Sequence, residues 1–277
     1  MIIQHNMTAA NTNRQLGITT GNLSKSAEKL SSGYRINRAG DDAAGLSISE
    51  KMRGQIRGLD QASTNAQDGI SLIQTAEGAL AETQSILQRM RELTVQAAND
   101  TNVTADRQAI AEEVRALTSE ITRIADQTEF NTMKLLSGSF SGKVLQVGAN
   151  SGQTIKFSIS CMNASKLGVA ADKIASKISA ATGGSSVSKL ISIVNTALTK
   201  VSTQRSKLGA LQNRLEHTIT NADNTSENLQ AAESRIRDVD MASEMVKYSK
   251  DNILQQAAQS MLAQANQSTQ GVLSILG

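Results

Sequence analysis

The chain has 277 residues, and its 28 Lys and Arg against 25 Asp and Glu leave a formal net charge of only +3. Neither a basic block nor an aromatic platform accompanies that charge, so nucleic-acid binding is not expected. The chain has no Pro, no Trp and only 2% aromatic residues, and this composition favours long uninterrupted helices over a globular enzyme.

Cysteine usage and hydropathy exclude two further classes of protein. The single cysteine, Cys161, cannot form an internal disulfide, so a disulfide-stapled domain is excluded. No apolar run approaches the roughly 20 residues that a membrane helix requires, so no membrane partner is expected. The first residues, MIIQHNMTAANTN, lack the basic and apolar regions of a secretory signal peptide. We therefore expect any export to use another route.

The first half of the chain predicts two helices. One is expected over about Asn6–Ser32, with Gly33 as its C-terminal stop. The next is expected over about Asp42–Asn99, capped by Asp41 or Asp42. At 1.5 Å per residue the second helix would be about 85 Å long, whereas a compact globule of this chain length is only about 50 Å across. We therefore predict a mainly α-helical fold built as a long coiled-coil-like helical rod.

The middle of the chain combines a third helix with a hairpin. A turn at Asn99–Thr104 places Thr104 as the N-cap of the third helix. Alternating apolar residues on both sides of GANSGQT then predict a small β-hairpin at about residues 139–160. A short, weakly patterned segment over residues 161–186 precedes a fourth long helix.

The two ends of the chain carry apolar residues spaced alternately four and three apart, the pattern of a coiled-coil contact. The residues of these stripes are Leu16, Leu23 and Leu30 at the N-terminus and Leu254, Ala258, Met261 and Val272 at the C-terminus, with Leu262 beside them. The C-terminal helix begins after Asp238–Asp240 and has no charge after Asp251. Because a helix with so small an apolar stripe needs a partner, we predict that the two ends form one terminal assembly seam. Without neighbouring subunits, such polar ends cannot offset the entropy of ordering, so we expect them to be disordered in the monomer.

Candidate catalytic and metal-binding residues are sparse. His5 and His217 are the only histidines, so no zinc motif can be assembled. The sequence GSFSGKV is one residue short of a phosphate loop and has Val144 where Ser or Thr would bind magnesium. The acidic pairs are better explained as helix caps. We expect no enzyme activity, no catalytic residue, and no metal or other cofactor.

Several long motifs give the chain a family resemblance. Those that resemble the N-terminal region of bacterial flagellins are KLSSGYRINRAGDDAAGLSISEKMRGQIRGL (Lys29–Leu59) and DGISLIQTAEGAL (Asp68–Leu80). Those that resemble the C-terminal region are QRSKLGALQNRLEHTI (Gln204–Ile219), AAESRIRDVDMASEM (Ala231–Met245) and NILQQAAQSMLAQANQSTQGVL (Asn252–Leu273). The resemblance covers about residues 1–160 and 187–277, and it is to the subunit of the flagellar filament.

This resemblance implies two domains and an assembly route. Residues 1–40 and 236–277 would form the inner domain of the filament core, and residues 41–235 a helical rod domain around it. Residues 161–186 stand where other flagellins have variable outer domains and are too short for one. The chain would be exported unfolded through the flagellar channel, bound beforehand by an export chaperone. Outside the cell it would form a helical homopolymer for motility, in contact with the filament cap and hook-junction proteins.

Two alternatives remain at this stage. A hook–filament junction protein shares flagellin-like ends, and a discrete coiled-coil binding module would share the helical stripes. Sedimentation distinguishes a filament subunit, which forms megadalton particles, from a module that stays a monomer or dimer.

One motif implies a host partner. QRMRELTVQ (Gln88–Gln96) resembles the flagellin stretch that Toll-like receptor 5 binds. Carried over by motif, Arg89, Leu93 and Gln96 match receptor-facing positions, and Glu113 in the third helix is a further match. Because their spacing of four and three places the first three residues on one helical face, we predict an exposed face that serves receptor binding, subunit assembly or both.

Overall fold

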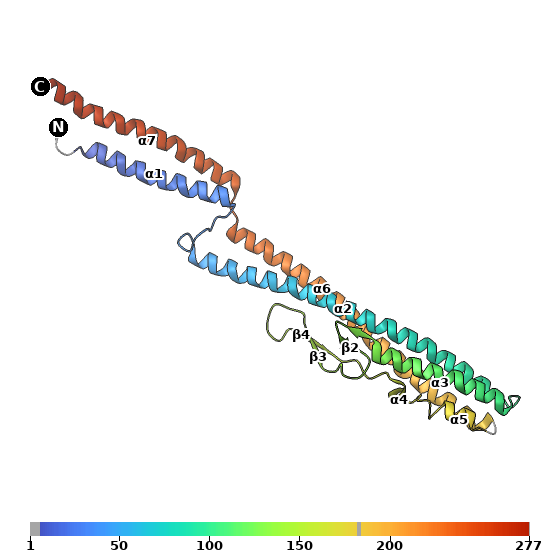
Figure 1. Ribbon diagram of the computed structural model, residues 1–277. Coiled ribbons are helices and arrows are strands. Elements are labelled where there is room, and N and C mark those ends of the chain that lie inside the picture. The colour runs from blue at the N-terminus through green and yellow to red at the C-terminus, as the bar shows by residue number, and fades with distance from the viewer. Residues whose placement is uncertain (1–5, 182–183, 277) are drawn as a thin grey trace. The chain divides into compact units, whose positions relative to one another are not determined.

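The computed structural model of the chain describes residues 6–181 and 184–276, without the side chains of Ser185 and residues 269–276. The helices are α1 (Met7–Ser32), α2 (Ala43–Ala97), α3 (Thr104–Gln127), α4 (Ala164–Leu167), α5 (Ala175–Ser179), α6 (Gly184–Arg237) and α7 (Met241–Leu276) (Figure 1). The strands are β1 (Glu129–Phe130), β2 (Met133–Lys134), β3 (Lys143–Gln146) and β4 (Thr154–Phe157). The prediction of a mainly helical fold with a small β-hairpin region is confirmed.

The chain divides into two compact units. One comprises Met1–Gly54 with Glu227–Gly277, and the other comprises Gln55–Ser226. We call them the terminal unit and the central unit. Both α2 and α6 pass from one unit into the other. The predicted division into residues 1–40 with 236–277 and residues 41–235 stays a prediction.

Local capping chemistry sets the ends of the terminal helices. The side-chain oxygen of Asn6 accepts a hydrogen bond from the backbone N–H of Ala9 at the start of α1. The helix ends at Gly33, whose φ of 75° is left-handed and whose N–H donates to the carbonyl of Lys29. Asp240 accepts from two backbone N–H groups in the first turn of α7. These starts and stops agree with the sequence prediction to within a residue.

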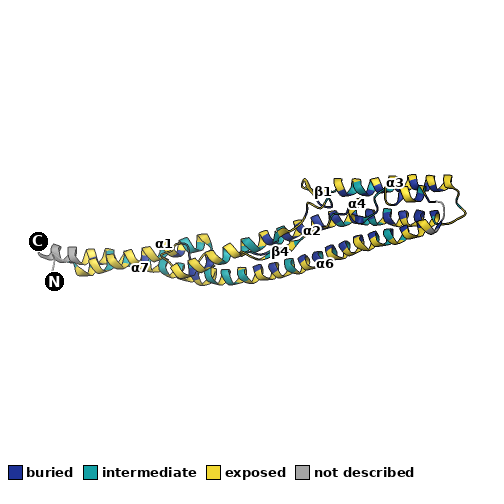
Figure 2. Ribbon diagram, turned by 90° about the horizontal axis from the view of Figure 1, so that it is seen from below, coloured by how far each residue is buried: buried dark blue, intermediate teal, exposed yellow. Residues whose placement is uncertain are grey.

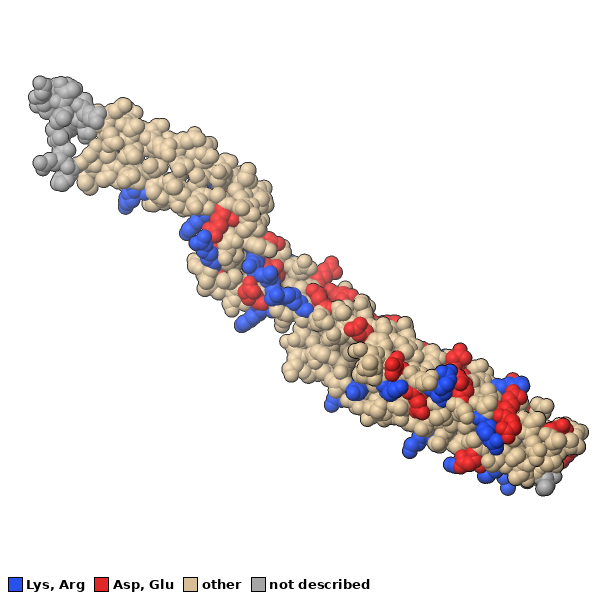
Figure 3. All heavy atoms as spheres, in the orientation of Figure 1, with Lys and Arg blue, Asp and Glu red and all other residues tan. Residues whose placement is uncertain are grey.

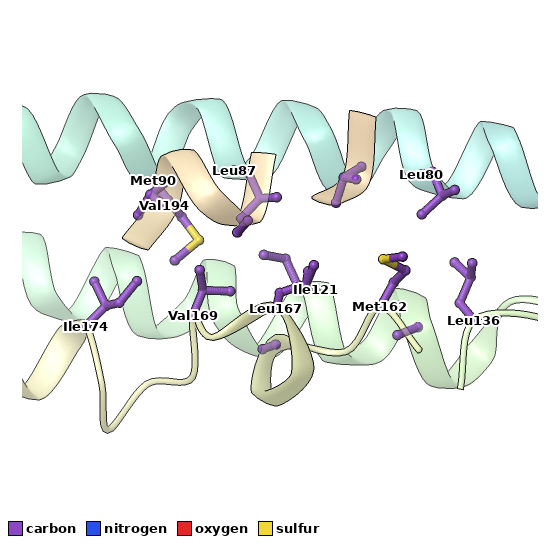
Figure 4. Packing of buried hydrophobic residues seen from close by; sticks show 14 of the residues in the cluster. Leu80, Leu87, Met90, Ile121, Leu136, Met162, Leu167, Val169, Ile174 and Val194 are labelled. Atoms are coloured by element: carbon purple, nitrogen blue, oxygen red, sulfur yellow. The ribbon is translucent and has the colours of Figure 1, made fainter. Parts of the chain in front are cut away.

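The central unit is built around one apolar cluster between α2, α3 and α6. Its largest fully buried side chains include Ile73, Leu80, Leu87, Met90, Ile121, Leu135, Leu136 and Ile159. Figure 4 shows side chains of these elements pointing toward one another, and Figure 2 shows their buried faces in dark blue. This unit therefore has a core of its own, which the long helices line.

Residues 161–186 differ from the weakly patterned variable segment that we expected. Within them, α4 and α5 pack against α3. Leu167, Val169, Ile174 and Ile178 are each 2% exposed or less and belong to the apolar cluster. These four residues are thus part of the core, and their irregular spacing did not indicate this in the sequence.

Two short antiparallel hairpins complete the central unit. Strand β3 pairs with β4 with Leu145 opposite Ile155, which confirms the predicted hairpin. The pairing of β1 with β2 was not predicted, because its turn residues are Asn131 and Thr132 rather than a glycine pair. Their φ angles of 47° and 63° supply the left-handed turn that joins closely spaced strands. Among the described residues, no helix is both long and apolar enough to cross a membrane.

Candidate functional site

The terminal helices α1 and α7 pack along each other. Their least exposed positions recur with alternating spacings of three and four residues. On α1 these positions include Ala9, Thr12, Leu16, Thr19, Leu23, Ser26 and Leu30, and on α7 they include Glu244, Tyr248, Asp251, Gln255, Ala258, Leu262 and Ala265. We call this stripe the paired face. It contains the predicted Leu16, Leu23, Leu30, Ala258 and Leu262.

Two predicted seam residues do not lie on the paired face. Leu254 is 44% exposed and Met261 is 61% exposed, because Gln255 and Leu262 occupy the neighbouring positions that turn toward α1. The predicted register followed the apolar residues, whereas small and polar side chains fill much of the contact. The side chain of Val272 lies outside the described residues.

The terminal unit as a whole has few buried apolar side chains and many exposed ones. Among its described residues, only Ile36 and Ala265 are buried apolar residues. The large apolar residues that it exposes are Met7, Ile18, Tyr34, Ile48, Met241, Met245, Val246, Ile253, Leu254 and Met261. Figure 3 shows few charged side chains over the visible surface of α1 and α7. Exposed large apolar residues that gather on one surface are typical of a binding interface.

A buried polar contact joins the two terminal helices. The hydroxyl of Ser26 donates to Oε1 of Glu244 at 2.7 Å, and Nζ of Lys247 lies 3.1 Å from Oε2 of the same carboxylate. Burial alone would raise the pKa of Glu244, but the bonds from Ser26 and Lys247 outweigh it and hold the pKa below its ordinary value of 4.5. The paired face therefore favours an ionised Glu244.

This contact predicts a weakening of the terminal pair in acid. A carboxyl group whose pKa is lower in the folded state contributes stability above its unfolded pKa and loses it as the pH falls through the folded one. Assembled protein should therefore dissociate progressively as the pH falls below 4.5, the ordinary pKa of the group, and Glu244→Gln should flatten that dependence. Sedimentation of assembled protein across a pH series measures the effect. Glu227→Gln, at an exposed position of the same unit, is the control. An unchanged acid profile in Glu244→Gln would contradict the assignment.

The predicted receptor-binding residues of α2 and α3 lie partly together. Nη2 of Arg89 on α2 lies 2.9 Å from Oε1 of Glu113 on α3, and its Nη1 lies 3.2 Å from Oε2 of Glu92. The hydrogen bond to Glu113, followed by that to Glu92, raises the pKa of Arg89. All three side chains are substantially exposed, so the pair presents a fixed guanidinium on the surface.

The prediction that Leu93 belongs to the exposed face is wrong. Leu93 is 2% exposed and packs in the apolar cluster of the central unit. Gln96 is exposed, and the apolar residue beside it on the surface is Val95, which is 52% exposed. Spacing alone showed that Arg89, Leu93 and Gln96 are neighbours, but not which of them faces the core.

A shallow hollow continues this surface of α2. Its volume is about 730 Å³, and it is lined by Gln88, Arg91, Glu92, Val95 and Gln96. We call these residues, with Arg89 and Glu113, the α2 face. The described residues include no group of three or more His, Cys, Asp or Glu that could hold a metal ion.

Comparison with known proteins assigns the family. The region described as "Bacterial flagellin N-terminal helical region" matches residues 3–141, and "Bacterial flagellin C-terminal helical region" matches residues 191–276. The chain belongs to the flagellin family. The flagellin of Halalkalibacterium halodurans is 58% identical and that of Bacillus subtilis 52% identical, each over the whole of both chains. The 33 kDa flagellar filament core protein of Treponema phagedenis is 51% identical, again over the whole of both chains.

Solved structures agree with the flagellin assignment at the level of fold. A putative flagellar hook-associated protein from Vibrio parahaemolyticus matches with a TM-score of 0.61 over 72% of this chain and 100% of its own, at 13% identity. That likeness shows the helical fold alone. The much closer relatives are flagellins, so the alternatives of a junction protein and a discrete coiled-coil module are not supported.

Membership of the flagellin family settles the general role. The chain is a structural subunit of the extracellular flagellar filament, the organelle of bacterial motility, and not an enzyme. These relatives align with the chain over its whole length, and no large outer domain separates its two flagellin regions.

Proposed function

We propose that this flagellin joins its neighbours in the filament through the terminal unit. The observation that supports the proposal is the distribution of apolar residues in the terminal unit. Ile253, Leu254 and Met261 are exposed, and among its described residues the buried apolar ones are only Ile36 and Ala265. Contacts between different surfaces of identical subunits, repeated without closing, produce an open helical filament. The paired face of α1 and α7 then holds each subunit together, and the exposed apolar residues contact other subunits.

This proposal predicts a large difference in protection between monomer and filament. In the monomer the terminal unit has almost no apolar core to offset an ordering cost of about 1–2 kcal/mol per residue. Limited proteolysis should therefore trim about residues 1–38 and 238–277 from the monomer and spare the filament. Equal protection of both states would show that the terminal unit folds without neighbours. Cleavage inside the central unit at the same protease concentration is the internal control.

The exposed apolar residues of α7 also support the proposed partners in export. An unassembled subunit presents Met245, Val246 and Ile253 to solvent, and a chaperone that covers them would prevent premature assembly. The chain would then pass unfolded through the flagellar export channel. At the growing end of the filament the same surface would contact the cap, and at the base it would contact hook-junction proteins.

We further propose that the α2 face binds Toll-like receptor 5. Arg89 is exposed and held by Glu113, and Arg is one of the residue types enriched in interface hot spots. The same surface would serve subunit contacts, so the monomer would activate the receptor and the intact filament would do so poorly.

Substitutions on the α2 face test the receptor proposal. Arg89→Ala together with Glu113→Ala should weaken receptor binding by about 2 kcal/mol or more, the loss that defines a hot spot. Surface plasmon resonance with monomeric protein measures the change. The control is Arg123→Ala, which breaks another exposed ion pair on α3. Unchanged affinity in the folded double variant would assign the face to assembly alone.

A further inference from the structure

The central unit contains a pocket apart from the surfaces discussed above. It lies between the end of the hairpin region, α4 and α6, and its volume is about 530 Å³. Its lining residues are Ser160, Cys161, Met162, Lys166, Leu167, Thr196, Thr199, Lys200, Thr203, Gln204 and Lys207. None of these residues belongs to the α2 face or to the terminal unit.

The pocket carries an uncompensated positive charge. Lys166, Lys200 and Lys207 line it, and no Asp or Glu is among its lining residues. Within the described residues none of these lysines forms an ion pair. Nζ of Lys200 donates to the carbonyl oxygens of Lys166 at 3.2 Å and Leu167 at 3.4 Å, which fixes one ammonium group at the wall. Three like charges around one hollow attract an anion.

A buried amide in the same wall has no partner. Gln204 is only 4% exposed, and its Nε2 makes no hydrogen bond in the structure. Buried polar groups are nearly always hydrogen-bonded, and this unpartnered Nε2 is a donor that can bond to an acceptor group of an occupant of the pocket.

Two apolar lining residues suit the carbon skeleton of an organic ligand. Met162 and Leu167 are 5% and 2% exposed and form an apolar part of the wall. An inorganic ion would leave this surface unused. From the three ammonium groups, the unpartnered amide and the apolar wall together, we propose that the pocket binds a small organic polycarboxylate.

The single cysteine of the chain provides a local reporter of occupancy. Cys161 lines the pocket and is partly exposed, so a neutral alkylating reagent such as N-ethylmaleimide reports access to it in the full-length monomer. Citrate should slow the alkylation in a saturable manner, whereas sodium chloride of equal ionic strength should not. Equal protection by inorganic phosphate would show that the pocket recognises negative charge alone and would overturn the assignment to an organic anion.

Two variants locate the effect in the pocket. Lys207→Gln should raise the citrate concentration for half-protection about tenfold, the loss expected for one charge-assisted contact. Gln204→Leu should abolish protection without lowering the melting temperature, because it removes the unpartnered amide at nearly constant volume. Lys189→Gln, the same change at an exposed position of α6 outside the pocket, should protect like the parent chain. Unchanged protection in Lys207→Gln would overturn the proposal. Because Lys207 is exposed, misfolding would not explain a loss of protection in this variant.

Discussion

Replacing Leu262 with aspartate should abolish filament assembly and leave the central unit folded. Leu262 lies half-buried on the paired face of α1 and α7. A carboxylate there would be buried without a cationic partner once subunits cover the pair, at a cost on the order of 3–5 kcal/mol per subunit. Because every subunit repeats the cost, polymerisation should fail altogether. Sedimentation and electron microscopy measure assembly, and circular dichroism verifies that the central helices remain.

A second aspartate substitution distinguishes the packing of α7 against α1 from its contacts with other subunits. Leu254 is 44% exposed in the single chain, so Leu254→Asp should block assembly only if neighbouring subunits cover that position. Gln259→Asp, on an exposed polar position of the same helix, is the control for added charge. If Leu262→Asp and Leu254→Asp both assemble normally, the terminal helix is not an assembly element.

Replacing Leu93 with alanine should destabilise the central unit by about 2–5 kcal/mol, the usual cost of truncating a buried leucine. Leu93 is 2% exposed within the apolar cluster, so the cavity would open between helices that cannot easily close it. Chemical denaturation of the monomer, followed by circular dichroism, measures the free energy of unfolding.

Val95→Ala is the matched control for Leu93→Ala. Val95 is 52% exposed and contributes to the α2 face, so its truncation should change the free energy of unfolding by less than about 0.5 kcal/mol. A stable Leu93→Ala variant would mean that Leu93 does not carry the packing that its burial implies. The comparison also separates loss of fold from loss of receptor binding.

Much of the fold could be predicted because its signals are local. Asn6 and Gly33 delimit α1 through hydrogen bonds to residues within four positions of themselves, and such caps are visible in sequence. The absence of Pro allowed α2 and α6 to run without a break. By contrast, the packing of α4 and α5 depends on contacts with α3, and the spacing of their apolar residues did not indicate it.

The candidate sites were predicted less completely because burial depends on distant parts of the chain. Arg89 and Glu113 could be paired through the family motif, and the structure brings them to 2.9 Å. Leu93 and Val95 are both apolar, and only the position of α2 against α3 and α6 decides which is buried. On α7 the preference for apolar residues shifted the predicted register, since Gln255 rather than Leu254 takes the place facing α1.

The contact between the two ends has a consequence for the timing of protein synthesis. Ser26 and Glu244 are 218 residues apart in the chain, and Asn6 donates through its side chain to the carbonyl of Ala265, 259 residues later. The first helix to leave the ribosome therefore acquires its partner only when translation is nearly complete. A prematurely terminated chain has an α1 with no complement, and it cannot form the paired face on which assembly is proposed to depend. If assembly depends on the paired face, this contact between the two ends would keep prematurely terminated subunits out of the polymer.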